Sequence, residues 1–525
     1  MLTHRPRAAL RRAATGLAVL LGLAVPALSG PARAAEPVTV TLWSWSPVAP
    51  TMAAMVAAIE KAHPDIRIRA TIQPHTAYFT ALKAAAASGT LPDIIGLTPG
   101  NYTQQYRPHL LALDAMAKAA WGAGWERHFA PALLAQARLG NPAGDIKFYM
   151  LPMEAEVLNL WLDRAAFHAA GIAKPPATFD ELVADAAKLR KAGFIGMYQG
   201  GATGVFDNWV YMQIAAQTDL KDLLAAEIGK PVWTRPGMIA AATVWGELFT
   251  RKVVQDGALA ALQYPTGANL FAVGRVGMIS LGSWWLQETH LSTDPKLRTM
   301  SGYDKFFFPA LTAGGMASAP LGGVDVGWGV TKTAAKSPAE ARAAAIVLKE
   351  LISGGGEQVA LNQLNDLPAF GGMRPQGTLP PAVRRLYDSY IAELAHAHPH
   401  QIGNPVIYQA LVSNLQAIGA GAKTPAAAMA AVQAVAEAQG KRDGGGRAPA
   451  PRIAPRRRAP ARGNPGCRAV GGGALRPPRR RAVRRLHRRA DRGQSCLQPD
   501  RPASSLGPRQ LHDGGGGPGV RHRHS

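Results

Sequence analysis

The stretch from residue 38 to residue 97 alternates strand-like and helix-like segments, and no other feature restricts the fold as much. Its segment "VTVTLWSW" (38–45) alternates apolar and polar residues and is rich in β-branched ones, which predicts a strand. The next segment, "VAPTMAAMVAAIEKAHP", carries apolar residues at helical spacing and ends at a proline. "DIRIRATIQ" then alternates again, "AYFTALKAAAASG" is helical, and "PDIIGLT" is a short apolar strand. This order predicts an α/β fold, with a parallel or mixed sheet covered by helices.

Capping signals mark helices later in the chain. "ATFDELVADAAKLRKAG" begins with Thr178, followed three residues on by Glu181, and it ends at a glycine. "SPAEARAAAIVLKELISGG" repeats this pattern with Ser337 and Glu340, after the predicted strand "GVDVGWGVTK". Residues 35–440 number about 400 and show no internal repeat, so they are long enough for two lobes with separate cores.

Residues 1–34 have the three parts of a secretory signal. Four arginines in "MLTHRPRAALRR" precede an apolar run of residues 17–28, and a small-x-small pattern closes the segment at residues 32–34. The apolar run is too short to span a bilayer, and the apolar residues that follow a twin-arginine pair are missing, which favours the general secretory route. Because the residue directly after the cleavage site is not a cysteine, we expect a periplasmic protein without a lipid anchor.

Residues 441–525 differ in composition from the rest of the chain. They hold 21 Arg and one Lys against four Asp, with no Phe, Trp, Tyr or Met, which predicts disorder. One explanation is a basic arm for nucleic acid or an anionic surface, although such arms usually interleave aromatic residues. We favour the other explanation, a frameshifted or wrongly assigned end, because out-of-register GC-rich codons give Arg, Pro, Gly and Ala. Cys467 and Cys496 both lie here, so the body has no disulfide.

The charge of the whole chain comes from its two ends. The formal net charge is +24, but residues 441–525 contribute +18 and residues 1–34 contribute five arginines, which leaves +1 for residues 35–440. The body is therefore close to neutral, and the high net charge does not indicate a nucleic-acid partner for it.

Several ordered blocks resemble one protein family. "VTVTLWSW", "IEKAHPDIRIRA", "YFTALKAAAASGTLPDIIGL" and "LLALD" are similar to the opening of the family 1 extracellular solute-binding proteins of ABC importers, which include maltose- and multiple-sugar-binding proteins. The segments "LPMEAEVLNLWLDRAAFHAAGIAKPPATFDELVADAAKLRKAG", "LFAVGRVGMISLGSWWL", "TKTAAKSPAEARAAAIVLKELIS" and "LVSNLQAIGAGAKTPAAAMAAVQAVAEA" follow in the family's order. The resemblance covers residues 38–439.

The resemblance implies a two-lobe periplasmic binding protein fold of type II with a central ligand cleft. It places residues 35–150 and 319–375 in the N-terminal lobe, and residues 151–318 and 376–440 in the C-terminal lobe. Hinge crossovers are expected near Pro152, Pro320 and residue 375. Open α/β sheets bind ligands at the carboxyl ends of their strands, which agrees with a cleft between the lobes.

Two adjacent tryptophans follow a glycine in "ISLGSWWLQ" (279–287). By resemblance, Trp284 and Trp285 occupy the place where the family sets an indole ring against its ligand. The apolar face of a sugar ring stacks on an aromatic face, and the hydroxyl rim needs a few polar groups. Adjacent residues point to opposite sides, so we expect Trp284 in the cleft and Trp285 inward. The alternative is that both rings pack in the core.

Other candidate ligand contacts stand where segments begin or end. Trp43, Trp45 and Ser46 close the first predicted strand, Asn101 follows the third strand, and Tyr78 begins a helix. The two tryptophans share a face by alternation, and either could reach the cleft or the core. Asn101 follows a glycine, so an exposed turn is an equally simple explanation.

Acidic and aromatic residues in three further segments complete the candidate site. By resemblance, Glu156 in "LPMEAEVLNLW" occupies the place of a carboxylate that accepts sugar hydroxyls, and Glu154 is the second choice; the alternative is a solvated edge. In "GGATGVFDNWVY" we expect contacts from Phe206, Asp207 and Trp209, unless Asp207 only caps the following helix. Asp325 and Trp328 in "GGVDVGWGV" are added candidates.

We therefore predict a monomeric periplasmic binding protein that captures a sugar or oligosaccharide by lobe closure and delivers it to an ABC permease. A glycerophosphodiester or a polyol is the alternative ligand. A glycoside-processing enzyme, with a carboxylate pair drawn from Glu154, Glu156 and Asp207, is the alternative of another class. We expect no metal, no cofactor and no nucleic acid partner. The segment "HAHPH" (396–400) is interpreted as a solvated turn rather than a metal tract.

Overall fold

The computed structural model describes residues 36–290 and 292–444. The predicted secretory signal (1–34) and the basic segment from residue 445 onward lie outside these residues. Residues 441–444 had been assigned to a disordered tail, and this prediction is wrong for them, because they continue the last helix, α17 (Pro425–Gly444).

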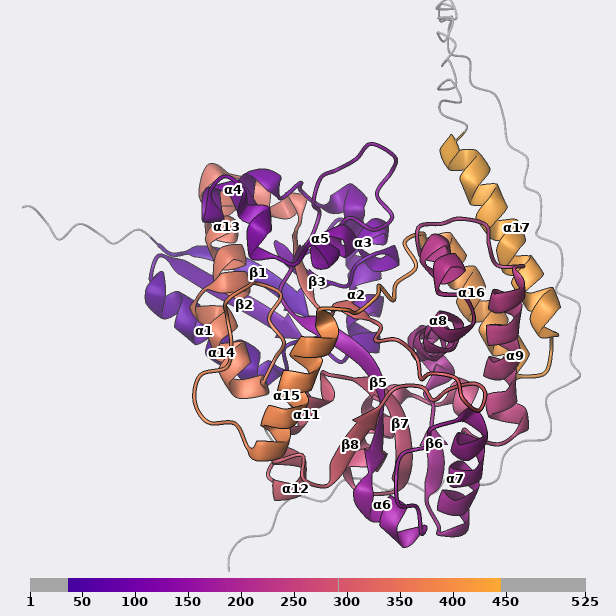
Figure 1. The fold of residues 1–525 in the computed structure, drawn as a ribbon. Coiled ribbons are helices and arrows are strands. Elements are labelled where there is room, and N and C mark those ends of the chain that lie inside the picture. The colour runs from indigo at the N-terminus through magenta and orange to yellow at the C-terminus, as the bar shows by residue number, and fades with distance from the viewer. Residues whose placement is uncertain (1–35, 291, 445–525) are drawn as a thin grey trace, which may run out of the picture. The chain divides into compact units, whose positions relative to one another are not determined.

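The first sheet has the strand order β2-β1-β3-β10-β4. Its strands are β1 (Val38–Ser44), β2 (Ile66–Ile72), β3 (Ile94–Leu97), β4 (Leu151–Pro152) and β10 (Gly327–Val330). The first three run parallel, and β10 is antiparallel to both of its neighbours. Three helices flank it in the sequence or contact it: α1 (Ala49–Ala62), α2 (His75–Ser88) and α13 (Pro338–Ser353). A fourth helix, α14 (Gly355–Leu364), packs on α1 and α13. The predicted β-α-β-α-β order is confirmed, and Figure 1 shows its strands and helices.

The second sheet has the order β6-β7-β5-β8, and a further strand, β9, pairs with β5. These strands are β5 (Ala155–Asp163), β6 (Ile195–Tyr198), β7 (Val276–Gly282), β8 (Tyr303–Phe306) and β9 (Gly322–Val324). Every residue of β5 and β7 is buried, because helices or loops cover both faces of these strands. The helices that contact them include α6 (Arg164–Ala169), α7 (Phe179–Lys191), α10 (Ala268–Ala272) and α15 (Pro381–Leu394).

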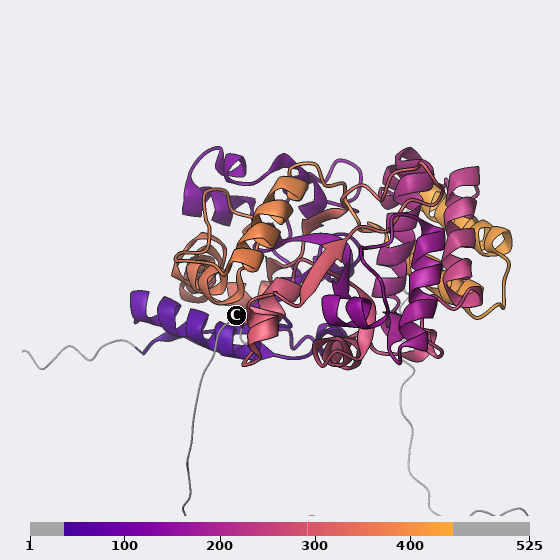
Figure 2. The same ribbon diagram turned by 60° about the horizontal axis from the view of Figure 1, so that its bottom comes forward.

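A group of helices packs beside the second sheet. Its members are α8 (Val205–Glu227), α9 (Pro236–Thr250), α16 (Pro405–Gly419) and α17, which contact one another (Figures 1 and 2). The remaining α-helices are short: α3 (Asn101–Tyr106), α4 (Asp114–Trp121), α5 (Pro131–Ala137), α11 (Trp285–His290) and α12 (Pro295–Arg298). Within the described ranges, none of the helices has the length and apolarity that crossing a membrane requires.

The two predicted capping signals are confirmed. The Thr178 hydroxyl accepts a hydrogen bond from the N–H of Glu181 at 3.2 Å, and the Ser337 hydroxyl accepts one from the N–H of Glu340 at 3.2 Å. These bonds satisfy N–H groups that have no partner inside the helix, so α7 and α13 start where the sequence places them.

The chain passes between the two sheets at adjoining segments. It passes from β4 to β5 at residues 153–154, next to the predicted Pro152, and from β9 to β10 at residues 325–326, shortly after the predicted Pro320. The N–H of Asp325 donates to the carbonyl of Glu154 at 2.9 Å, and a third segment, 366–369, pairs with residues 153–155. We call residues 153–155, 325–326 and 366–369 the crossover segments. The predicted two-lobe α/β fold is confirmed.

Candidate functional site

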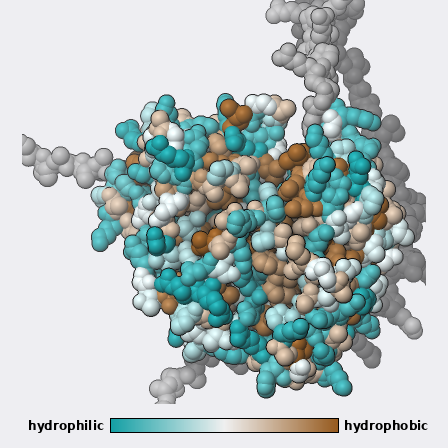
Figure 3. Space-filling view, viewed as in Figure 1, coloured by the Kyte–Doolittle hydropathy of each residue, from teal (hydrophilic) through white to brown (hydrophobic). Residues whose placement is uncertain are grey.

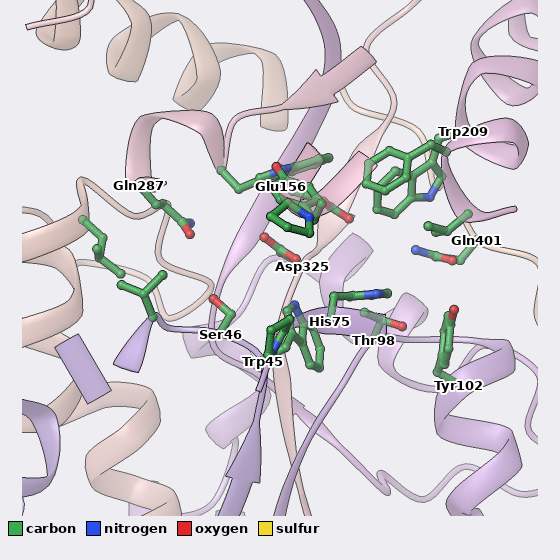
Figure 4. A pocket seen from close by; sticks show the side chains of 18 residues that line it. Trp45, Ser46, His75, Thr98, Tyr102, Glu156, Trp209, Gln287, Asp325 and Gln401 are labelled. Atoms are coloured by element: carbon green, nitrogen blue, oxygen red, sulfur yellow. The ribbon is translucent and has the colours of Figure 1, made fainter. Parts of the chain in front are cut away.

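A cavity of about 410 Å³ opens where strands of both sheets end. The residues that line it come from strand ends, helix starts and the crossover segments: Trp45, Ser46, Val48, Pro74, His75, Thr98, Tyr102, Glu156, Val205, Phe206, Trp209, Tyr264, Pro265, Trp284, Gln287, Asp325, Leu364 and Gln401. Figure 4 shows labelled side chains around it. Ligand sites of open α/β sheets form at such an edge, so we take this cavity as the candidate site and call it the pocket.

Four aromatic rings form one wall of the pocket. Trp209 lies between Phe206 and Trp284, with centroid separations of 5.3 Å and 5.4 Å. The Trp284 indole N–H donates a hydrogen bond to the Tyr264 hydroxyl at 2.8 Å, and the Phe206 and Tyr264 centroids are 6.0 Å apart. These contacts fix the ring orientations, so the wall presents aromatic faces that are already in place.

Gly282, at the end of β7, makes room for the Trp284 ring. A Cβ atom at this glycine would lie 2.1 Å from Cζ3 and 2.6 Å from Cε3 of that ring. Carbon atoms normally approach no closer than about 3.5 Å, so any other residue here would displace the indole. The glycine in "ISLGSWWLQ" is therefore required by the tryptophan two residues after it.

The opposite wall is built around Trp45, which follows β1. Its ring contacts His75 at 5.6 Å, Tyr78 at 5.4 Å and Phe79 at 5.1 Å between centroids. The Tyr78 hydroxyl donates to the carbonyl of Gly96 at 2.7 Å, which anchors this support to β3. Burial lowers the pKa of His75 to about 4, so its ring is uncharged at neutral pH.

Glu156 on β5 is paired with His400 inside the molecule. Glu156 Oε1 and His400 Nε2 are 2.6 Å apart, and the two side chains are 1% and 0% exposed. Burial raises the pKa of Glu156 well above its usual value and lowers the pKa of His400 to about 4. Burial therefore disfavours the charged form of both groups. The prediction that "HAHPH" forms a solvated turn is wrong for His400, because Glu156 and Trp209 cover its ring.

Three further carboxyl groups lie behind the lining. Glu154, Glu357 and Asp366 are each fully buried. Ser46 donates to Glu154 at 3.3 Å and Gln287 donates to Asp366, so two lining side chains connect the pocket to these acids. Burial, together with the charge of the neighbouring carboxyl groups, raises the pKa of all three. Among residues 36–290 and 292–444, no group of His, Cys, Asp or Glu side chains is arranged to hold a metal.

The pocket brings together seven of the fourteen predicted site residues. They are Trp45, Ser46, Glu156, Phe206, Trp209, Trp284 and Asp325. Figure 4 shows Trp45 and Ser46 on one side of the open space, Glu156 and Trp209 on the other, and Asp325 between them. On the face shown in Figure 3, hydrophobic residues collect near the centre and hydrophilic ones dominate the margins.

Three of the other predicted residues are tryptophans that pack inside the molecule, Trp285 at the start of α11 and Trp43 and Trp328 within strands of the first sheet. Trp285 packs against Phe271 at 5.5 Å, and the indole N–H of the fully buried Trp328 points to Met153 Sδ at 3.0 Å. Trp43 is half-buried within β1 and does not line the pocket. Strands covered on both sides do not reveal from sequence which face meets a cavity.

The last four predicted residues lie behind the lining. They are Tyr78, Asn101, Glu154 and Asp207. Tyr78 supports Trp45 and Glu154 supports Ser46, as described above. Asn101 is 4% exposed, rather than in an exposed turn, and its N–H donates to the carbonyl of Ile402 at 3.0 Å. Asp207 accepts a hydrogen bond from Gln199 at 2.9 Å.

Several polar residues of the lining were not predicted from the sequence. Thr98 directly follows the third strand and could have been found by the strand-end argument that found Ser46. Tyr264 lies in the short π-helical turn Gln263–Gly267 and Gln401 lies in a loop, so neither stands on an element long enough to show periodicity. Gln287 lies on α11, a helix too short to show a periodic face.

A family model described as bacterial extracellular solute-binding protein matches residues 44–348. Among curated proteins, a binding protein of Brucella abortus (strain 2308) is 26% identical over 265 residues, which are 50% of this chain and 61% of that protein. The chain therefore matches less than two thirds of the length of that relative.

Two solved structures show the same fold. A chitin oligosaccharide binding protein has a TM-score of 0.64 at 22% identity, and the match covers 77% of this chain and 98% of that one. An ABC substrate-binding protein from Listeria monocytogenes in complex with cycloalternan has a TM-score of 0.60 at 19% identity, over 77% of this chain and 100% of that one.

Proposed function

The chain belongs to the bacterial extracellular solute-binding proteins, the family 1 binding proteins of ABC importers, and on this premise we propose that it captures a sugar or oligosaccharide for uptake by a permease. The observation that carries this proposal is the pocket itself. Its walls are the aromatic groups of Trp45 and of Trp209 with Trp284, and its polar groups come from both sheets. Rings of a saccharide have apolar faces that fit such walls.

The similar structures support a saccharide ligand. One neighbour is named for chitin oligosaccharides and the other holds cycloalternan. The lining also favours sugar over a phosphodiester, because no lysine or arginine of the described residues is part of it. Recognition of a phosphate commonly uses charged side-chain donors, which this lining does not supply. A polyol could use the polar groups but would leave the aromatic faces without a ring to stack on.

We also propose how binding is signalled. The resemblance puts residues 35–150 and 319–375 in one lobe and residues 151–318 and 376–440 in the other. Because β4 pairs in the first sheet and β9 in the second, we place the first two boundaries at the crossover segments 153–155 and 325–326, where the lobes would rotate. A ligand held by both lobes stabilises the closed form by its differential affinity for that form. The permease would then recognise the closed form of a secreted, periplasmic monomer. Small-angle scattering should show a smaller radius of gyration with ligand than without it.

The function is binding rather than glycoside hydrolysis. The family to which the chain belongs and the two similar solved structures are described as binding proteins. Of the three carboxylates predicted for an enzymatic pair, only Glu156 lines the pocket, and its Oε1 is engaged with His400. A glycosidase needs a free acid and a free second carboxylate on either side of the glycosidic bond. Incubation with chromogenic glycosides should therefore give no turnover.

The test is a titration with malto-, cello-, xylo- and chito-oligosaccharides, a glycerophosphodiester and polyols, followed by calorimetry and tryptophan fluorescence. We expect saturable binding of at least one saccharide, and a loss of about tenfold or more in Trp284→Ala. Trp121→Ala is the matched control, because this indole packs on Trp125 and Phe370 outside the pocket. Binding of the phosphodiester or a polyol, with no saccharide bound, would overturn the proposal.

A further inference from the structure

Two polar residues line the pocket from different sheets and are held by buried acids. Ser46 lies two residues after β1 of the first sheet, and Gln287 lies on α11, which follows β7 of the second sheet. Figure 4 shows both side chains at the pocket. Ser46 Oγ donates to Glu154 Oε2 at 3.3 Å, and Gln287 Nε2 donates to Asp366 Oδ1. The positions of both lining side chains therefore depend on acids behind the lining.

The two acids are also hydrogen-bonded to each other. Glu154 and Asp366 form a side-chain hydrogen bond. Their crossover segments pair through the backbone, because the N–H of Ala155 donates to the carbonyl of Leu367 at 2.7 Å. Four side chains thus form one continuous chain from the first sheet, through two crossover segments, to the second sheet, and we call it the carboxyl chain: Ser46, Glu154, Asp366 and Gln287.

The carboxyl chain is continuous only if it holds a proton. The second oxygen of each acid, Glu154 Oε1 and Asp366 Oδ2, accepts no hydrogen bond from an N–H or O–H group of the described residues. Carboxylates only accept hydrogen bonds, so the two groups can bond to each other only when one of them is protonated. Both residues are 0% exposed, and none of the described lysines, arginines or histidines forms a salt bridge with them. A shared proton therefore satisfies both acids without a counterion.

The titratable groups around the two acids come from α14, the crossover segment 325–326, α15 and β5: Glu357, Asp325, Tyr387 and Glu156. Burial first, and then the charges of Glu357 and Asp325, raise the pKa of Asp366. Burial and the charge of Asp366 raise the pKa of Glu154, and its hydrogen bonds to the lining lower it by less. Arg374, which lowers the pKa of the α15 tyrosine, is exposed and screened by water. The proton is therefore retained at neutral pH and is lost as the pH rises.

We propose that Glu154 and Asp366 are positioning residues, whose shared proton fastens two crossover segments together and keeps Ser46 and Gln287 in place for the ligand. Loss of this proton at alkaline pH leaves two adjoining carboxylates, whose repulsion separates the segments and displaces both lining side chains. Saccharide affinity then falls as the pH rises. This effect on binding rests on the proposed function, whereas the proton is present with or without a ligand.

Two conservative variants replace the proton by an N–H group. In Glu154→Gln the amide can donate to Asp366 and its carbonyl can accept from Ser46, so the carboxyl chain stays continuous when Asp366 is ionised. Asp366→Asn does the same from the other side, with Gln287 as the donor to its carbonyl. Glu227→Gln is the matched control, because it removes a carboxyl group of α8 that is equally buried, has a raised pKa and lies outside the lining.

The binding test is calorimetry between about pH 6 and about pH 10, with the malto-, cello-, xylo- or chito-oligosaccharide that binds tightest at neutral pH. We expect the affinity of the parent and of Glu227→Gln to fall by about tenfold or more across this range. The affinity of Glu154→Gln and Asp366→Asn should fall by less than about twofold and lie within about threefold of the parent at neutral pH. A parent profile without a fall, or an equal fall in the two variants, would overturn the inference and leave saccharide binding intact.

Infrared spectroscopy tests the proton without any ligand, because a protonated carboxyl group has a C=O stretching band that a carboxylate lacks. The parent at neutral pH should have one such band more than Glu154→Gln, and this band should disappear as the pH rises. Equal spectra of the two proteins would overturn the inference. If no saccharide binds, the proposed function fails, and the infrared comparison alone decides whether the two acids share a proton.

Discussion

Gly282→Ala tests whether the backbone of β7 sets the position of the Trp284 ring. The added methyl would lie 2.1 Å from Cζ3, 2.6 Å from Cε3 and 2.7 Å from Cη2 of the indole. Contact distances of about 3.5 Å then require the ring to move by about 1.4 Å. Such a shift breaks the 2.8 Å hydrogen bond to Tyr264 and disturbs the packing on Trp209.

The cost can be estimated from these contacts. Overpacking of a filled site costs about 1–3 kcal/mol, and the lost hydrogen bond adds about 1 kcal/mol. We therefore expect Gly282→Ala to lower the free energy of unfolding by about 2–4 kcal/mol. Saccharide affinity should fall about tenfold, because a displaced ring loses a stacking contribution of about 1 kcal/mol together with buried area.

A double-mutant cycle provides the assay. Urea unfolding and calorimetry are applied to Gly282→Ala, Trp284→Ala and the double variant. Without the indole the new methyl meets open space, so Gly282→Ala should cost less than about 1 kcal/mol in that background. Gly440→Ala is the control, since nothing lies within 4 Å of its Cβ position. Equal costs of Gly282→Ala in both backgrounds, or normal affinity in the single variant, would refute the reasoning.

Three further predictions concern buried groups around the pocket. Burial raises the pKa of Asp207 to about 6, above its unfolded value, so the native state binds more protons and loses stability as the pH rises from 4 to 6. Relative to the parent protein, the free energy of unfolding of Asp207→Asn should increase by up to about 3 kcal/mol across that interval, measured by urea unfolding at pH 4, 5, 6 and 7. A stability difference that does not change with pH would contradict this. Trp285→Ala should lower the free energy of unfolding by about 3–5 kcal/mol while calorimetry finds unchanged saccharide affinity; weaker binding by the folded protein would place this ring in the site. His400→Ala leaves Glu156 Oε1 without its hydrogen-bond partner, so the free energy of unfolding, measured by thermal unfolding, should fall by about 1–3 kcal/mol. His400→Gln keeps a hydrogen-bond donor and should recover part of this loss. Equal losses in the two variants would contradict the hydrogen-bond role.

Local patterns were enough to predict the fold of the first sheet. In "DIRIRATIQ", Ile66 and Ile68 are buried, whereas Arg67 and Arg69 are exposed. The alternation in the sequence therefore follows from a strand that is covered on one face only. The capping bonds of α7 and α13 are similarly local, because donor and acceptor lie three residues apart. What the periods cannot supply is the pairing of β10 with β3, across more than two hundred residues.

The site was predictable only where a strand end points toward it. Trp45, Ser46 and Trp284 directly follow strands whose pattern is clear, and they line the pocket. Trp328 lies inside a strand covered on both faces, so neither its composition nor its alternation shows that it is fully buried. His400 was misread because its burial depends on long-range packing, and a histidine in a proline-containing loop carries no local sign of that.

The same physical arrangement occurs on both walls of the pocket, and it explains how a ring can be both fixed and available. Trp284 lies against Gly282 of β7, and Trp45 lies near Gly96 of β3, where a Cβ would be 3.3 Å from its Cζ3 and 2.3 Å from the Ser44 hydroxyl. An indole that packs against a glycine gains dispersion contacts with the backbone on that side. The glycine adds no side chain that could occupy the space around the ring. Because each ring is held by the backbone of a different sheet, rotation at the crossover segments would change the distance between the two aromatic walls without changing either wall. The spacing of the walls, rather than the shape of either one, would then respond to the ligand.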